Sequence, residues 1–146
     1  MTYQNSTEFA AGAGDRPRVL LVEDNTALRM LMADVLDLEG YQVTQAANAD
    51  EMRSAIAWAE TSRSKHDAFD LVVTDIRMPG QSGLEALSQL RRSGSQSQFL
   101  VVTAFPEDAT TLRTTELGAP LLAKPFSLAE FRQVVATLVA TSAVAQ

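Results

Sequence analysis

The sequence predicts an α/β protein in which a parallel sheet is covered by helices on both faces. Five short apolar runs of strand length recur along the chain, and amphipathic helical patterns separate them. Alternation of this kind implies right-handed crossover connections, which build parallel sheets. With 146 residues, of which 46% are hydrophobic and 21% charged, the chain fits one ordinary globular domain.

The predicted strands share short length and apolar character. They span residues 18–22, 41–46, 69–74, 99–103 and 121–123. Ahead of them, residues 1–16 mix Thr, Ser, Asn, Gln, Gly and Ala without periodicity, which predicts a mobile leader. We therefore expect the folded domain to occupy residues 17–146.

Three helical patterns place apolar side chains on one face at intervals of three and four residues. The apolar positions are Leu28, Leu31, Met32, Val35 and Leu36 in the first pattern, Met52, Ala55, Ile56 and Ala59 in the second, and Leu84, Leu87 and Leu90 in the third. Gly40 supplies a stop signal for the first helix. We expect all three apolar faces to pack on the sheet.

The remaining two helices differ in how strongly the sequence supports them. The terminal helix begins with a capping box, in which Ser127 is followed three residues later by Glu130. Its apolar stripe consists of Leu128, Phe131, Val135 and Leu138. Residues 107–117 offer only Ala109, Leu112 and Leu117 as an apolar face, so we expect this helix to be the least firmly held.

Composition excludes several classes of function. A formal net charge of −6 and a pI near 4.7 argue against direct nucleic-acid binding, which needs a clustered Lys/Arg face. The absence of cysteine excludes disulfides, thiolate metal sites and cysteine nucleophiles. No apolar run is long enough to cross a membrane and no secretory signal begins the chain, so we expect a cytoplasmic protein without membrane insertion.

Three ring-bearing side chains are assigned no chemistry. Trp58 lies in a helical pattern and Tyr41 in a strand pattern, so both are expected to pack within the fold. His66 lies in a polar stretch without a neighbouring Cys or second His, which predicts an exposed loop residue.

Polar side chains of distinctive chemistry follow four of the five predicted strands. Glu23 and Asp24 follow the first strand, Asp75 the third and Lys124 the fifth, and Thr103 ends the fourth. The carboxyl ends of parallel strands share one edge of the sheet, so residues far apart in sequence can converge there. We expect three carboxylates, a hydroxyl and an ammonium to meet.

Such a set of carboxylates suits a hard divalent cation. Two carboxylates about 4 Å apart repel by roughly 4 kcal/mol at an effective dielectric near 20. Mg²⁺ offsets this repulsion and typically binds through one or two carboxylates together with waters and phosphate oxygens. A carboxylate can also attack phosphorus to form an aspartyl-phosphate when positive charge neutralises the transferring group.

Four motifs occur in a fixed order along the chain. They are Val22-Glu23-Asp24-Asn25, Asp75-Ile76-Arg77-Met78-Pro79-Gly80 followed by Gly83, Val102-Thr103-Ala104, and Lys124-Pro125-Phe126. Each is weak alone, because an acidic pair or a Met-Pro-Gly stretch is first of all a turn. In this order they resemble the response-regulator receiver family of two-component signalling, and the resemblance covers residues 18–138.

The resemblance implies a metal-assisted phosphoacceptor site. Asp75 matches the phosphoacceptor, and Glu23 and Asp24 match the acidic pair that binds Mg²⁺, or Mn²⁺, together with it. Arg77 matches the position whose backbone carbonyl binds the metal.

The remaining matches concern the phosphoryl group. Thr103 and Lys124 match the hydroxyl and the ammonium that contact it, and Ala104 matches the backbone amide that does so. Arg77 and Phe105, two residues beyond Asp75 and Thr103, are expected to restrict the attacking water. We therefore expect slow autodephosphorylation and no turnover of an external substrate.

The resemblance also implies a topology and partners. Receivers have a flavodoxin-like, doubly wound sheet of order 2-1-3-4-5, and their Lys-Pro bond, here Lys124-Pro125, is usually cis. The expected phosphodonor is a sensor histidine kinase or a histidine phosphotransfer protein. The expected output is a contact with a downstream protein through one face of a stand-alone receiver. That face is formed by the fourth helix (residues 107–117), the fifth strand (residues 121–123) and the terminal helix.

One departure from the family pattern concerns this output. Many receivers carry an aromatic residue three positions before the Lys, where this chain has Leu121. Our hypothesis is that a shift of Thr103 transmits phosphorylation to the output face without that aromatic residue.

Several alternatives stay open or are disfavoured by particular residues. A phosphorelay intermediate or phosphate sink shares all of this chemistry, and a receiver-like scaffold that is never phosphorylated shares the fold. A hydrolase with an aspartate nucleophile would need a second Asp where Arg77 stands. A flavin-binding module would need a phosphate-binding loop where Glu23 and Asp24 repel phosphate.

Overall fold

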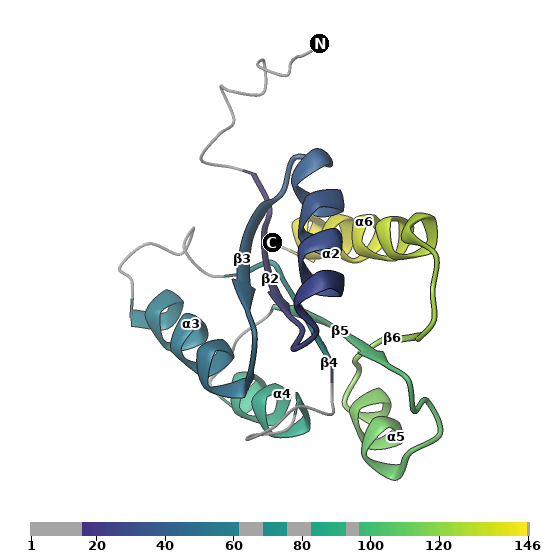
Figure 1. Cartoon of the computed structure of the whole chain (residues 1–146). Coiled ribbons are helices and arrows are strands. Elements are labelled where there is room, and N and C mark those ends of the chain that lie inside the picture. The colour runs from purple at the N-terminus through teal and green to yellow at the C-terminus, as the bar shows by residue number, and fades with distance from the viewer. Residues whose placement is uncertain (1–15, 62–68, 76–82, 93–96, 146) are drawn as a thin grey trace.

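Five parallel strands form one sheet at the centre of the computed structural model, which describes residues 16–61, 69–75, 83–92 and 97–145 (Figure 1). The strands are β2 (Arg18–Val22), β3 (Gln42–Ala46), β4 (Leu71–Asp75), β5 (Gln98–Thr103) and β6 (Leu121–Ala123). Their order across the sheet is β3-β2-β4-β5-β6, which is the predicted order 2-1-3-4-5. The predicted α/β class and doubly wound topology are confirmed.

The helices between the strands are α2 (Thr26–Leu38), α3 (Ala49–Thr61), α4 (Gly83–Arg92), α5 (Ala109–Glu116) and α6 (Leu128–Ala145). Gly40 follows α2 with a φ of 93°, a left-handed conformation that glycine adopts without a Cβ clash. The capping box of α6 is present, since Glu130 N–H donates to Ser127 Oγ and Ser127 N–H donates to Glu130 Oε1. Both sequence signals for helix ends are thus confirmed.

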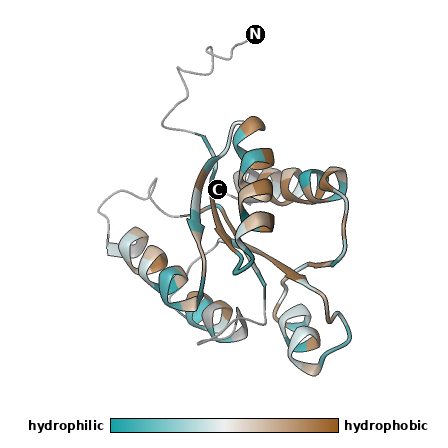
Figure 2. Ribbon diagram, in the orientation of Figure 1, coloured by the Kyte–Doolittle hydropathy of each residue, from teal (hydrophilic) through white to brown (hydrophobic). Residues whose placement is uncertain are grey.

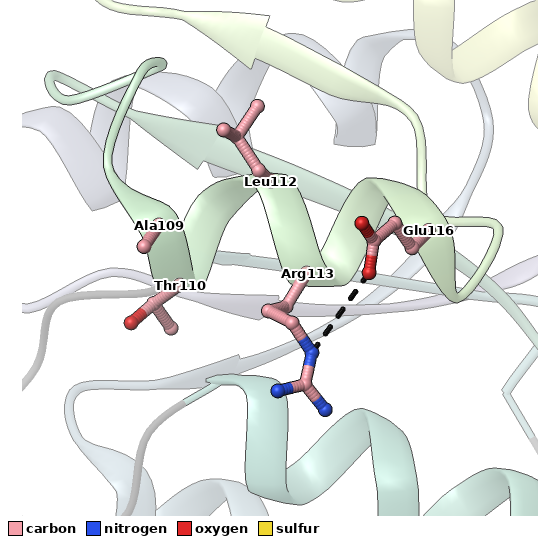
Figure 3. Close-up of a pocket in the computed structure, with 5 residues that line it drawn as sticks. All are labelled: Ala109, Thr110, Leu112, Arg113 and Glu116. Atoms are coloured by element: carbon pink, nitrogen blue, oxygen red, sulfur yellow. Dashed lines mark ion pairs between the residues drawn. The ribbon is translucent and has the colours of Figure 1, made fainter.

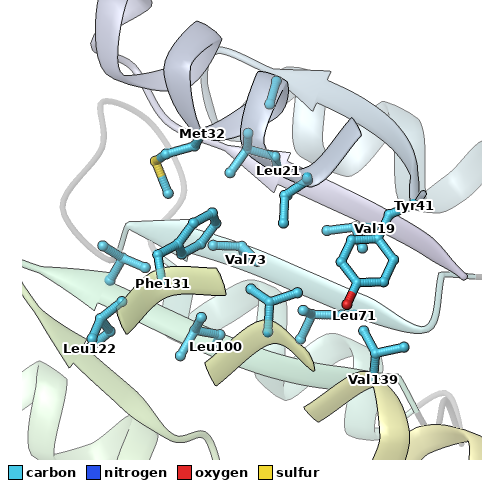
Figure 4. Close-up of a cluster of buried hydrophobic side chains, with 14 residues drawn as sticks. Val19, Leu21, Met32, Tyr41, Leu71, Val73, Leu100, Leu122, Phe131 and Val139 are labelled. Atoms are coloured by element: carbon cyan, nitrogen blue, oxygen red, sulfur yellow. The ribbon is translucent and has the colours of Figure 1, made fainter. Parts of the chain in front are cut away.

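Side chains alternate between two apolar layers on either side of the sheet. Figure 2 shows hydrophobic residues alternating with hydrophilic ones along α2, as expected for a helix that packs on the sheet by one face. Val19 and Leu21 of β2 point toward α2 and α6, where Phe131 fills the centre of the layer (Figure 4). Leu20 of β2 points the other way, toward α3 and α4. Burial of both faces explains why β2, β4 and β5 read as nearly continuous apolar runs. The edge strand β3 (QVTQA) is only partly buried and is correspondingly more polar.

Two residues expected in the core lie at the surface instead. Trp58 on α3 is 78% exposed, and Leu31 on α2 is also exposed. Each sits one position away from a helical stripe that does face the sheet, so helical spacing alone placed it on the wrong side of that stripe. Tyr41, by contrast, is buried as expected.

Helix α5 turns its hydroxyl groups inward and its apolar side chains outward. Ala109, Leu112 and Leu117 are exposed, whereas Thr111 and Thr114 are fully buried. Thr111 Oγ1 donates to the carbonyl of Phe105, so its hydroxyl is satisfied within the fold. The expected packing face of this helix was therefore wrong.

Parts of the predictions fall outside the described residues. They are the leader up to residue 15, His66, the part of the second motif that follows Asp75, including Arg77, and the side chain of Leu84. Among the described helices, none has both the length and the apolar character that crossing a membrane requires.

Candidate functional site

Strand register brings the predicted acids to the same level of the sheet. Val22 of β2 pairs with Thr74 of β4, so the residues that follow them, Glu23 and Asp75, stand side by side. The two strands are neighbours at the point where the chain reverses its direction of travel across the sheet, which is where doubly wound folds bind ligands. Carboxylate oxygens of Glu23, Asp24 and Asp75 all lie within 4.8 Å of one another. The predicted convergence is therefore observed.

Lys124 supplies positive charge to this acidic cluster from the end of β6. Its backbone N–H donates to the Thr103 carbonyl at 2.7 Å, and the Lys124-Pro125 peptide bond is cis, as expected. Its Nζ donates to Glu23 Oε1 at 2.9 Å and to Asp75 Oδ2 at 3.0 Å. One ammonium thus bridges two of the three carboxylates.

Burial and hydrogen bonding together set the protonation behaviour of the Glu23–Lys124–Asp75 bridge. Burial raises the pKa of the Glu23 carboxyl, and this outweighs the hydrogen bonds from Lys124 and from Asn25 N–H, which lower it. Burial alone would lower the pKa of Lys124, but its hydrogen bonds to Glu23 and Asp75 raise it above the ordinary value of 10.5. Lys124 therefore stays charged at neutral pH.

Two other predicted site residues, Thr103 and Ala104, lie at the carboxyl end of β5, at the same edge of the sheet. Thr103 is fully buried at the end of β5, and its hydroxyl accepts the Phe105 N–H at 3.0 Å. Ala104, the next residue, is exposed, so its backbone is reachable from solvent. Arg77, expected to offer a carbonyl oxygen, lies outside the described residues.

The donor set of the acidic cluster fits a hard divalent cation. All three side chains offer carboxylate oxygens, the ligands that Mg²⁺ prefers. Glu23 is only 1% exposed, whereas Asp24 is exposed, so the cluster is anchored on the protein side and open on the solvent side. An open side leaves room for waters or phosphate oxygens, which usually complete Mg²⁺ coordination.

Comparison with known families decides what kind of domain this is. The sequence model of a family described as the response regulator receiver domain matches residues 19–136. The chain belongs to the response-regulator receiver family. Receivers are signalling domains of two-component and phosphorelay systems, and accepting a phosphoryl group on an aspartate is implied by membership.

Relatives of this receiver differ in length. It is 31% identical over 119 residues to sporulation initiation phosphotransferase F of Bacillus subtilis, covering 81% of this chain and 90% of that protein. It is 33% identical over 114 residues to the transcriptional regulatory protein PdtaR of Mycobacterium tuberculosis, covering 77% of this chain. This receiver spans only 52% of the length of PdtaR.

Solved structures support the same fold for this receiver. The non-phosphorylated HemR receiver domain of Leptospira biflexa matches with a TM-score of 0.72 and 32% identity, covering 85% of this chain and 94% of that one. A CheY-like receiver domain from Methanospirillum hungatei JF-1 matches with a TM-score of 0.77 at 23% identity, covering 90% and 99% respectively. The second match bears on the fold alone.

Sequence reasoning missed two residues that stabilise the turn formed by residues 23–25, which we call the acidic turn. Asn25 N–H donates to Glu23 Oε2 at 3.1 Å, and the Arg29 guanidinium donates to the Glu23 carbonyl oxygen at 2.8 Å. Asn25 ends the first of the four sequence motifs, but the motif assigned it no role. Arg29 gave no signal, because a lone Arg on an amphipathic helix ordinarily lies in solvent.

A separate feature lies on α5. A surface pocket there is lined by Ala109, Thr110, Leu112, Arg113 and Glu116 (Figure 3). Arg113 Nε and Glu116 Oε1 lie 3.9 Å apart and form an exposed ion pair, drawn as the dashed line in Figure 3. The pocket therefore joins apolar and charged groups outside the acidic cluster.

Proposed function

We propose that this receiver is a phosphorylation-dependent switch that accepts a phosphoryl group on Asp75, with Mg²⁺, and acts through protein contacts. One observation carries the proposal. The carboxylates of Glu23, Asp24 and Asp75 lie together while Lys124 contacts Asp75 at 3.0 Å. This arrangement combines a nucleophilic oxygen, a set of metal ligands and a fixed positive charge.

The donor in this proposal is a histidine of a sensor kinase or phosphotransfer protein. An Asp75 carboxylate oxygen forms the new bond to phosphorus as the phosphorus–nitrogen bond breaks, and that electron pair stays on the imidazole nitrogen. Mg²⁺ held by Glu23, Asp24, Asp75 and the Arg77 carbonyl would neutralise charge on the transferring oxygens. No second Asp stands two residues after Asp75, which supports a phosphoacceptor rather than a hydrolase.

Three further groups would contact the phosphoryl oxygens. Lys124 already lies against Asp75, so its ammonium needs only a small shift to reach an oxygen attached there. The Thr103 hydroxyl would move from the Phe105 N–H to the phosphoryl group, and the Ala104 amide would donate beside it. We infer slow autodephosphorylation, because Arg77 and Phe105 flank the site in sequence.

A downstream protein would bind a face made by α5, β6 and α6, which we call the output face. Phe105, Leu112 and Leu117 are exposed on or beside α5, and the α5 pocket lies among them. Thr103 is linked to this helix through the Phe105 backbone, since Thr111 Oγ1 donates to the Phe105 carbonyl at 3.0 Å. A shift of the Thr103 hydroxyl would therefore move α5. This coupling would not use an aromatic side chain, because Leu121 stands where many receivers have one.

The test is the intact mass after treatment with acetyl phosphate and Mg²⁺. Wild type is expected to gain one phosphoryl group and Asp75→Asn none. Asp37→Asn, an exposed aspartate on α2, is the matched control and should gain the same mass as wild type. A wild type that gains no mass would instead favour a receiver-like scaffold, and a gain in Asp75→Asn would place the acceptor elsewhere.

A relay intermediate or phosphate sink is the second candidate. The phosphotransferase from Bacillus subtilis supports it, because this chain spans 90% of that protein. Phosphorylated wild type mixed with a histidine phosphotransfer protein separates the two functions. Rapid transfer of the phosphoryl group to that protein favours a relay, and retention on Asp75 favours a switch.

A further inference from the structure

Arg29 connects three parts of the fold behind the acidic turn. It lies in the second turn of α2 and is half-buried. Its Nη1 donates to the backbone carbonyl oxygen of Glu23 at 2.8 Å, and its Nε donates to Gln45 Oε1 on β3 at 3.3 Å. Figure 1 shows α2 and β3 on either side of the end of β2. The planar guanidinium thus holds two acceptors at a fixed separation.

The carbonyl that Arg29 holds belongs to the peptide that leads into Asp24. This peptide is planar, so fixing its oxygen also fixes the Asp24 nitrogen and limits where the Asp24 side chain can start. On the other side, Glu23 N–H donates to the Ala46 carbonyl at 3.1 Å and Asn25 N–H donates to Glu23 Oε2 at 3.1 Å. The acidic turn is therefore held by hydrogen bonds along its backbone.

Asp24 depends on this backbone more than its two neighbours do. Glu23 and Asp75 are buried, and Lys124 holds both of their carboxylates. Within the described part of the chain, no hydrogen bond or ion pair restrains the Asp24 carboxylate. Its distance from the other two acids is consequently set by the turn itself.

We propose that Arg29 is a positioning residue that sets the Asp24 carboxylate at the spacing a divalent cation requires. The inference rests on the proposed function, since it assumes that the acidic cluster binds Mg²⁺. Gln45 is the outer anchor, because it orients the guanidinium toward the Glu23 carbonyl. Neither residue contacts the metal, so both act through the peptide between Glu23 and Asp24.

The experiment compares Mg²⁺ dissociation constants, measured by calorimetry on the full chain, across matched variants. Arg29→Met keeps the length of the side chain and removes every donor, and it should weaken Mg²⁺ binding at least tenfold, the usual effect of losing a hydrogen bond that orients a ligand. Arg29→Lys keeps one donor and should lose less. Gln45→Ala leaves the carbonyl contact in place and should lose less than Arg29→Met. Arg53→Met, an exposed arginine on α3, should bind as wild type does.

A second measurement separates positioning from general stabilisation. The urea midpoint of unfolding without metal should change little in Arg29→Met, and the amide resonances of Asp24 and Asn25 should broaden. A merely structural Arg29 would instead lower the urea midpoint and leave the Mg²⁺ dissociation constant unchanged. If Arg29→Met does not fold, the order of affinities among wild type, Arg29→Lys and Gln45→Ala decides the matter.

The outcomes distinguish this inference from the proposed function. Variants that bind Mg²⁺ as tightly as a wild type that also accepts a phosphoryl group overturn the role of Arg29 alone. A wild type that binds no Mg²⁺ overturns both. Weakened Mg²⁺ binding in Arg29→Met, with no phosphorylation of wild type, supports the role of Arg29 and removes the proposed function.

Discussion

Glu23 combines deep burial with a charge. The side chain is 1% exposed, yet both of its oxygens are engaged, one by Lys124 and the other by the Asn25 N–H. Burying a carboxylate costs free energy unless partners satisfy it, so an apolar residue would suit stability at this position better. An ionisable group at so buried a position is therefore consistent with a ligand role rather than a structural one.

The raised pKa of Glu23 predicts a specific pH dependence of stability in the metal-free protein. Between its ordinary value of 4.5 and its higher folded value, the folded state binds more protons than the unfolded state. The contribution of Glu23 is therefore fully present below about pH 4.5 and declines as the pH rises through the folded pKa. Glu23→Gln removes this titration.

The measurement is the free energy of unfolding in urea, at steps from about pH 4 to about pH 8. The stability of wild type relative to Glu23→Gln should fall as the pH rises. A difference that stays constant over this range would show that the carboxyl is not perturbed by folding.

Lys124 should matter for stability as well as for the proposed phosphoryl contact. Lys124→Met removes two charge-assisted hydrogen bonds and leaves the carboxylates of Glu23 and Asp75 without their shared cation. We expect a loss of about 2–3 kcal/mol in the free energy of unfolding without metal. Mg²⁺ should restore more stability to Lys124→Met than to wild type, because it replaces the missing charge.

Urea unfolding with and without Mg²⁺ checks this expectation. Arg132→Met on α6 is the control, since Arg132 is exposed and its loss should change stability by under about 0.5 kcal/mol. Equal stability of Lys124→Met and wild type would rule out a stabilising bridge.

Helix α5 is held by hydroxyl groups rather than by an apolar face. Thr111 Oγ1 donates to the Phe105 carbonyl, and Thr114 Oγ1 donates to the Thr111 carbonyl at 2.6 Å. Because both hydroxyls are satisfied by nearby backbone, threonine can be buried here without an unpaired polar group. This leaves Leu112 of α5 and Leu117, which follows the helix, free to face outward on the output face.

A pair of leucine substitutions tests whether α5 packs by its threonines rather than by Leu112. Leu112 is 53% exposed, so Leu112→Ala should cost under about 0.5 kcal/mol. Leu87 on α4 is fully buried, and Leu87→Ala should cost about 2–5 kcal/mol because it leaves a cavity. Chemical denaturation of both variants gives the comparison. A cost of several kcal/mol for Leu112→Ala would mean that α5 packs on the fold through Leu112.

What the sequence could predict depended on how many independent signals each helix or strand carried. The strands were found to within one or two residues, and α6 was found from its capping box and its stripe, since Phe131 and Val135 are fully buried. Helix α5 has few apolar residues, so periodicity could not tell an inward face from an outward one. The direction of α5 follows from side-chain hydrogen bonds, which spacing does not reveal.

The candidate site was predictable in its members but less so in its internal contacts. Strand ends identified the acids and Lys124, because a parallel sheet gathers such ends at one edge. The hydrogen bond from Lys124 to Glu23 depends on side-chain rotamers. The hydrogen bonds of Arg29 to the acidic turn and to Gln45 depend also on how closely α2 approaches β3. Those are tertiary features without a local sequence signature.

The whole molecule combines a sheet that is covered on both faces with an acidic cluster that is open to solvent at one edge. Apolar layers cover both faces of the sheet, while the acidic cluster sits at the carboxyl ends of β2 and β4, its central neighbours. Residues that meet there come from both halves of the chain, so the site exists only when the sheet is assembled. Any ligand of this edge must therefore stabilise the whole fold.

Removal of the metal provides the corresponding prediction. Mg²⁺ at about 100 times its dissociation constant should add about 2.7 kcal/mol to the free energy of unfolding, provided that it binds only the folded state. Thermal unfolding with excess Mg²⁺ and again with EDTA measures the difference. Asp24→Asn should reduce it, because one ligand is lost. Identical melting temperatures in both conditions would contradict binding at this edge.

The exposure of Trp58 has a practical consequence for spectroscopy. Trp58 is the single tryptophan of the chain and is 78% exposed on α3, so its indole is surrounded by water in the native state. Its emission should change little on denaturation, which makes fluorescence a weak monitor of unfolding for this protein. Because unfolding changes this emission little, a blue shift of Trp58 emission on mixing with another protein would indicate that the partner binds at α3.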